Sequence, residues 1–142
     1  MVRVAVDEVG RVHLVGAVAL LYPEAQVVEE MLQGWRNQQL SRNLQFATIE
    51  QRARYVRRFI VHVNEFPWRW TPSHVEEYFG DLRSITQLRH ATLRGQQCAL
   101  RHFTSYIANP DYGWDLVCER LFGTHPGAGV LRLEHRRPCA GI

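Results

Sequence analysis

Hydrophobic residues recur at steps of three and four along most of the chain from Pro23 onward. This spacing places them on one face of a helix, with polar residues on the other. The pattern predicts helices over residues 23–40, 48–66, 72–83 and 92–108, and a short one over 115–121. Their inner faces include Val27, Val28, Met31, Leu32, Trp35, Ile49, Val56, Val75, Tyr78, Leu93, Leu100, Phe103 and Ile107. We therefore expect a mainly α protein, a bundle of four to five helices.

Three threonines stand where predicted helices begin. Thr71 precedes Pro72, and proline is favoured at the first helical position. Thr48 has Gln51 three residues later, the spacing of a capping box. Thr92 is the third candidate N-cap. Each helix N-terminus also presents free N–H groups that suit a phosphate.

The two ends of the chain have other patterns. Residues 1–22 are rich in valine, and "VRVAV" and "RVHLV" alternate around Gly10, which indicates a short hairpin or a weakly structured arm. Residues 126–142 show no period, which indicates an irregular tail. One helical domain over residues 23–125 is the expectation.

Positive charge is concentrated in the middle of the chain. All 17 basic residues are arginine, which a GC-rich genome alone could explain. From Arg36 to His102, however, eleven arginines face five acidic residues, so this stretch carries about +6. A basic region of this kind favours a polyanionic partner.

The arginines are separated from the apolar seams. In the second predicted helix, Arg52, Arg54, Arg57 and Arg58 fall off the seam, and in the fourth, Arg94, Gln97 and Arg101 share a second face. Arginine recognises phosphate and guanine, and glutamine recognises adenine. The alternative is a solvated face paired with Glu50 or Glu65. Likewise, Trp68, Trp70, Phe79, Phe103 and Trp114 could stack on bases, although helical spacing favours the core.

Enzymatic motifs are missing from the sequence. It contains no GxSxG, HExxH, GxGxxG or P-loop pattern, its seven histidines are scattered, and its three cysteines form no CxxC. We expect no catalytic residue, metal, cofactor or small-molecule substrate. No apolar run approaches the ~18 residues of a membrane span. Cysteines without a disulfide framework, and no signal peptide, predict a cytoplasmic protein.

Three segments together resemble a known family. "LSRNLQFATIEQRARYVRRFIVH", "PWRWTPSHVEEYFGDLR" and "TLRGQQCALRHFTSYIANPDYGWDLVCERLFGTHP" are similar to the N-terminal core-binding domain of actinobacterial tyrosine recombinases of the phage-integrase type. The resemblance implies a SAM-like bundle that forms half of a clamp around double-stranded DNA, with the second and fourth helices in the major groove. The DNA-contact positions it implies are Arg42, Thr48, Arg52, Arg54, Arg58, Thr92, Arg94, Gln97 and Arg101.

The chain also departs from that family. The catalytic domain supplies a tyrosine nucleophile and an Arg-Lys-HxxR constellation, whereas this sequence has no lysine and no tyrosine after Tyr112. "GAGVLRLEHRRPCAGI" does not resemble the family's continuation, so we expect a truncated chain without recombinase activity. The alternatives are an interaction module that modulates a full-length recombinase, and a non-functional remnant.

Overall fold

The computed structural model describes residues 3–6, 12–15 and 23–126, and helices dominate them. The α-helices are α1 (Pro23–Ser41), α2 (Phe46–Val63), α3 (Pro72–Ser84), α4 (His90–Ala108) and α5 (Trp114–Phe122). Two 3-10 turns, η1 (Pro67–Arg69) and η2 (Pro110–Tyr112), join α2 to α3 and α4 to α5. The prediction of a mainly α bundle is confirmed.

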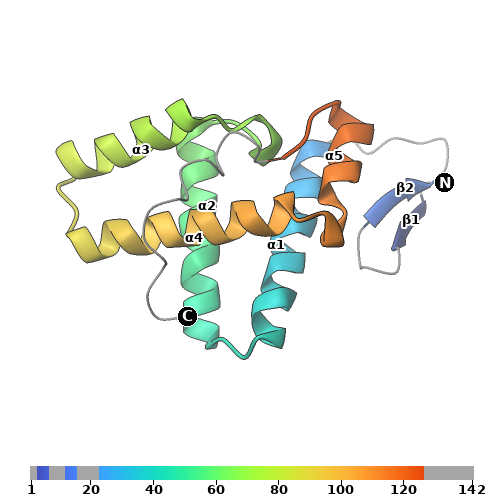
Figure 1. Cartoon of the computed structure of the whole chain (residues 1–142), viewed down its shortest axis with the longest axis horizontal. Coiled ribbons are helices and arrows are strands. Elements are labelled where there is room, and N and C mark those ends of the chain that lie inside the picture. Colours follow the sequence, from blue (N-terminus) through green and yellow to red (C-terminus); the bar gives the residue numbers. More distant parts are fainter. Residues whose placement is uncertain (1–2, 7–11, 16–22, 127–142) are drawn as a thin grey trace.

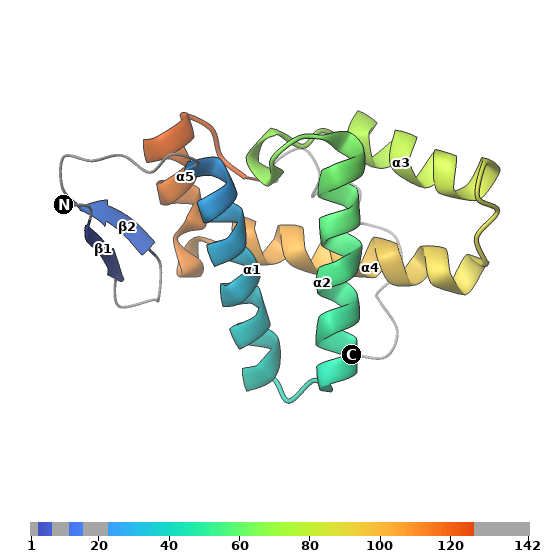
Figure 2. The same ribbon diagram turned by 180° about the vertical axis from the view of Figure 1, so that it is seen from behind.

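Two helices cross at the centre of the bundle. α1 and α2 form an antiparallel pair joined by a short turn, and α4 runs across α2 at a steep angle (Figures 1 and 2). The contact between α2 and α4 is the most extensive between any two described helices. α3 packs beside both of them, and α5 contacts α4. The second and fourth helices are thus the crossing pair.

Strands precede the bundle. β1 (Arg3–Val6) pairs antiparallel with β2 (Val12–Val15), with Val4 opposite Leu14. These paired strands agree with the first of the two readings of this segment, a short hairpin, over residues 3–6 and 12–15. The rest of the expected arm, and the expected tail beyond Pro126, lie outside the described residues.

Aromatic side chains fill the interior. Trp35 meets Phe103 edge-on at 5.1 Å between ring centroids, and Phe59 contacts Trp70 in the same manner at 4.8 Å. Such edge-to-face pairs add to the stabilisation that buried area provides. Trp68, Trp70, Phe103 and Trp114 are all buried, and Phe79 packs against the core. The core interpretation of these residues is confirmed, and they present no platform for stacked bases.

The start of α3 follows its sequence signals. The Thr71 hydroxyl accepts a hydrogen bond from the His74 N–H at 3.4 Å, and His74 Nδ1 accepts one from the Thr71 N–H at 3.1 Å. Pro72 occupies the first helical position. This reciprocal pair satisfies two backbone donors that the helix leaves unpaired.

Two other expected caps are wrong. α2 begins at Phe46 after Gln45, and α4 begins at His90 after Arg89, so Thr48 and Thr92 each lie inside the first turn. Neither observed N-cap residue makes a side-chain capping bond. Both starts are exposed, where water can satisfy the free N–H groups, so no threonine side chain is needed.

Two further expectations from the sequence concern the cysteines and membrane-spanning helices. Cys98 is disulfide-bonded. The sequence was expected to form no disulfide framework, but the spacing of cysteines does not show which thiols folding brings together. Cys118 is free and buried. Within the described part of the chain, no helix is both long and apolar enough to cross a bilayer.

Candidate nucleic-acid interface

The outer face of α4 carries the predicted polar stripe. Arg94 and Gln97 are exposed, and Arg101 is half-buried, while Leu100 and Phe103 on the opposite face are buried. Seven residues separate the two arginines, which is about 10 Å along a helix. The stripe therefore forms one continuous strip on the outside of the bundle.

The arginines of α2 point in different directions. Residues two apart on a helix differ by about 200° around its axis, so Arg52 and Arg54 leave α2 on nearly opposite sides. Arg52 is half-buried and turns towards α1, whereas Arg54 is exposed and bonds to Gln51 on its own helix. Arg58 is exposed and lies where its charge acts on Tyr78 of α3. The α2 arginines therefore do not form a single cationic face.

The charges of three arginines from separate segments act on one histidine. The pKa of His102 is lowered to about 4, first by burial and then by the positive charges of Arg52, Arg101 and Arg42, in that order of effect. His102 is half-buried on α4, and its Nε2 atom is buried without a hydrogen-bond partner among the described residues. These three charges come from α2, α4 and the α1–α2 turn. We call Arg42, Arg52 and Arg101 the arginine cluster.

Gln39 organises this region from α1. It is 3% exposed, and its Oε1 accepts a hydrogen bond from Arg52 Nη1 at 3.1 Å. Its side-chain nitrogen donates to the Trp35 carbonyl at 3.4 Å, and its own carbonyl accepts the Arg42 N–H at 3.2 Å. One buried amide residue thus fixes both Arg52 and the turn that carries Arg42.

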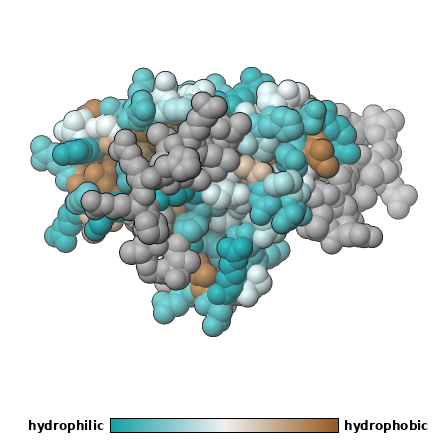
Figure 3. Space-filling view, in the orientation of Figure 1, coloured by the Kyte–Doolittle hydropathy of each residue, from teal (hydrophilic) through white to brown (hydrophobic). Residues whose placement is uncertain are grey.

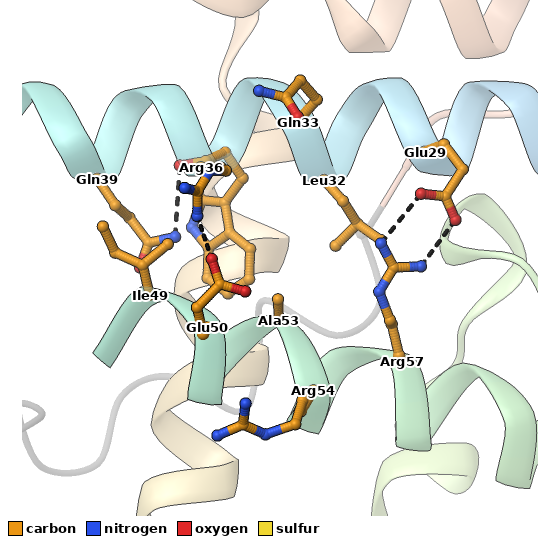
Figure 4. Close-up of a pocket in the computed structure, with 11 residues that line it drawn as sticks. Glu29, Leu32, Gln33, Arg36, Gln39, Ile49, Glu50, Ala53, Arg54 and Arg57 are labelled. Carbon is orange, nitrogen blue, oxygen red and sulfur yellow. Dashed lines mark hydrogen bonds and ion pairs between the residues drawn. The ribbon is translucent and has the colours of Figure 1, made fainter. Parts of the chain in front are cut away.

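Other arginines of the basic middle region are neutralised in a groove between α1 and α2 (Figure 4). Arg57 holds Glu29 through two hydrogen bonds of 2.7 and 3.0 Å, and Arg36 pairs with Glu50. The Glu29 carboxylate raises the pKa of Arg57, and Arg57 lowers that of Glu29. The expected pairing of the arginine face with carboxylates is thus correct for Arg57, though its partner is Glu29. These ion pairs join two helices.

The surface at the α1–α2 turn is mostly hydrophilic. Figure 3 shows the protruding ends of α1 and α2 as largely teal, with only small hydrophobic patches. Among the described residues, Arg42, Arg58 and Arg94 form no ion pair. These charges remain available to an anionic partner.

The structure groups only part of the predicted contact set. The charges of Arg42, Arg52 and Arg101 all act on His102, and Arg94 and Gln97 lie with Arg101 on one side of α4. Arg54 and Arg58 lie elsewhere on α2, and the threonines expected as caps are not caps. Sequence reasoning missed His102 and Gln39. His102 directly follows Arg101, so its place next to a predicted contact residue could have identified it. Nothing in the sequence links Gln39 to Arg52.

Histidines and carboxylates in the described ranges form no metal site. No group of three or more potential ligands comes together there. His62–Asp81 and His125–Glu119 are isolated exposed pairs at 3.6 Å.

Comparison with known proteins adds no relative. No family model, no curated protein and no solved structure matches this chain.

Proposed function

We propose that this chain is a double-stranded DNA-binding domain of the core-binding type found in integrase-like recombinases. The observation that supports the proposal is that the charges of Arg52 on α2 and Arg101 on α4, the two crossing helices, both act on His102. Cationic side chains from two crossing helices suit a sugar-phosphate backbone. The proposed role is binding without catalysis.

The polar stripe on α4 also supports the proposal. A helix with its side chains is about 10–12 Å wide, which matches the major groove. Arg94, Gln97 and Arg101 lie on the outer face of α4 and can reach base edges or phosphates. The core tryptophans are buried, so the domain should prefer duplex to single-stranded DNA.

Salt dependence tests the proposal. A labelled duplex is titrated at several salt concentrations, with single-stranded DNA as the competitor. Each phosphate contact contributes about −0.9 to the slope of log affinity against log salt concentration, so four arginine–phosphate contacts would give a slope of about −3.6. A flat salt response, or equal competition by single strands, would contradict a duplex-binding role.

A double variant tests the site. Arg94→Ala with Arg101→Ala should halve the slope to about −1.8 and weaken binding, because two phosphate contacts are lost. The matched control is Arg69→Ala with Arg83→Ala, which removes the same charge from η1 and the last turn of α3. Circular dichroism checks that helicity is kept. Equal effects from both pairs would remove the α4 stripe from the interface.

A further inference from the structure

Gly95 is an exposed glycine inside α4, directly after Arg94. Glycine destabilises a helix interior relative to alanine, so its presence there needs a reason. The backbone supplies none, because Gly95 lies in a regular helix and has no positive φ. Packing supplies none either, because an added Cβ would lie 3.9 Å from Cε2 of Tyr55, an ordinary van der Waals distance. The fold would therefore accept alanine at this position.

Two other glycines in the described helices show what distinguishes Gly95. Gly34 leaves room for the hydroxyl of Tyr106, so packing explains it. Gly80 faces open space, because a Cβ there would meet no atom within 4 Å. Gly95 is exposed and also has a side chain of the crossing helix α2 beside it. It therefore lies where a ligand held at the α2–α4 crossing can reach the backbone of α4.

Tyr55 is the residue of α2 that lies beside this glycine. The side chain is half-buried, and its hydroxyl has no hydrogen-bond partner among the described residues and is not sealed from solvent. Tyr78, in contrast, donates its hydroxyl proton to Gln96 at 3.1 Å inside the bundle. A tyrosine hydroxyl with no partner in the fold is available as a donor to a ligand.

Arg94 adds a positive charge next to the exposed backbone of Gly95. It is exposed and forms no ion pair with a described residue. A DNA strand offers groups that match these three residues. Its phosphate oxygens accept hydrogen bonds from tyrosine and arginine, and glycine allows the backbones of protein and ligand to approach closely.

We propose that Gly95 is the point where a DNA strand approaches the backbone of α4 most closely, and that the Tyr55 hydroxyl donates a hydrogen bond to a phosphate of that strand. The proposal rests on the proposed function, and it adds two contact residues that carry no charge. A neutral contact increases affinity without releasing a counterion, so its effect differs from that of an arginine when the salt concentration is varied.

Gly95→Ala separates binding from folding. The variant should raise the urea concentration at the unfolding midpoint, because alanine favours the helix and its Cβ fits beside Tyr55. It should nevertheless weaken duplex binding about tenfold, the scale of crowding one close contact. The matched control is Gly80→Ala, which should raise the midpoint and leave the affinity unchanged.

Two results of this comparison would contradict the close approach. Wild-type duplex affinity in Gly95→Ala would show that no strand lies against the backbone at this position. A lower urea midpoint in the same variant would show that packing, and not a ligand, explains the glycine.

Tyr55→Phe tests the phosphate contact by removing one oxygen atom and keeping the ring beside Gly95. Affinity should fall about tenfold, the scale of one hydrogen bond to a charged group, and the salt slope should stay the same. Arg94→Ala should make the slope less steep by about 0.9. The urea midpoint of Tyr55→Phe should equal that of the wild type, because the hydroxyl has no partner in the fold. Unchanged affinity would refute this contact.

A labelled duplex, titrated at one low salt concentration with the wild type and these variants, separates the two proposals. Weaker binding by Gly95→Ala and Tyr55→Phe, but not by Gly80→Ala, is the expected result. Wild-type binding that Gly95→Ala and Tyr55→Phe leave unchanged would refute the contact and leave the DNA-binding function standing. No duplex binding by the wild type would refute both.

Discussion

A single glycine in α1 makes room for the side chain of Tyr106 from α4. A Cβ atom at Gly34 would overlap the hydroxyl oxygen of Tyr106 and lie 3.2 Å from its Cζ. That hydroxyl also accepts a hydrogen bond from Trp114 Nε1 at 3.1 Å. The glycine therefore allows a tyrosine to bridge α1, α4 and α5 in the core. Its role is steric, because it sits in the middle of a regular helix.

Gly34→Ala is accordingly expected to destabilise the fold. Alanine normally stabilises a helix by about 1 kcal/mol relative to glycine, but overpacking against Tyr106 should cost about 1–3 kcal/mol and outweigh this gain. Urea denaturation measures the difference.

The matched control for Gly34 is Gly80→Ala in α3. A Cβ there would meet no atom within 4 Å. We expect this variant to gain about 0.5–1 kcal/mol. Two alanine variants with the same sign of effect would disprove the steric role of Gly34.

At the scale of elements, helices were predictable and their first turns were only partly so. Periodicity located α1 and α5 within one residue of their observed bounds, because an amphipathic face repeats over several turns. A cap is a single residue, and exposed helix starts can rely on water. Thr71, which precedes Pro72, was predicted correctly, whereas Thr48 with only Gln51 to support it, and Thr92 with no second signal, were not.

Because Thr71 is an N-cap and Thr48 is not, replacing each with alanine should change the stability of the fold by different amounts. Thr71→Ala removes a capping bond and should lower the free energy of unfolding by about 1 kcal/mol. Thr48→Ala, inside the first turn of α2, should change it by less than about 0.5 kcal/mol. Thermal or urea unfolding of both variants gives the comparison. A larger loss at Thr48 would mean that its hydroxyl caps α2 in solution.

At the scale of the molecule, tertiary packing decided which arginines meet. Sequence spacing identified the α4 stripe, because one helix fixes Arg94 relative to Arg101. It could not separate Arg52 from Arg57, since only the neighbouring helix determines whether a guanidinium faces Gln39 or Glu29. The cluster around His102 also joins a turn to two crossing helices. Its members are up to 59 residues apart in sequence, from Arg42 to Arg101, and no local pattern relates them.

The cluster should also make stability depend on pH. The pKa of His102 is about 4 in the folded state, against an ordinary 6.5 in the unfolded chain. Between these values the unfolded state binds a proton that the folded state does not, so stability decreases as the pH is lowered. The contribution is fully present above pH 6.5 and is lost as pH falls through 4. Because His102 is only half-buried, we expect a loss of about 2 kcal/mol by pH 4.5.

His102→Gln isolates this effect from the carboxylates that titrate in the same range. Glutamine does not bind the proton, so the variant should lose about 2 kcal/mol less than the wild type between pH 7 and pH 4.5. Urea unfolding in acetate and in a non-phosphate buffer at pH 7 measures the two slopes. Equal slopes would mean that burial and the neighbouring arginines do not lower the pKa of His102 in the folded state.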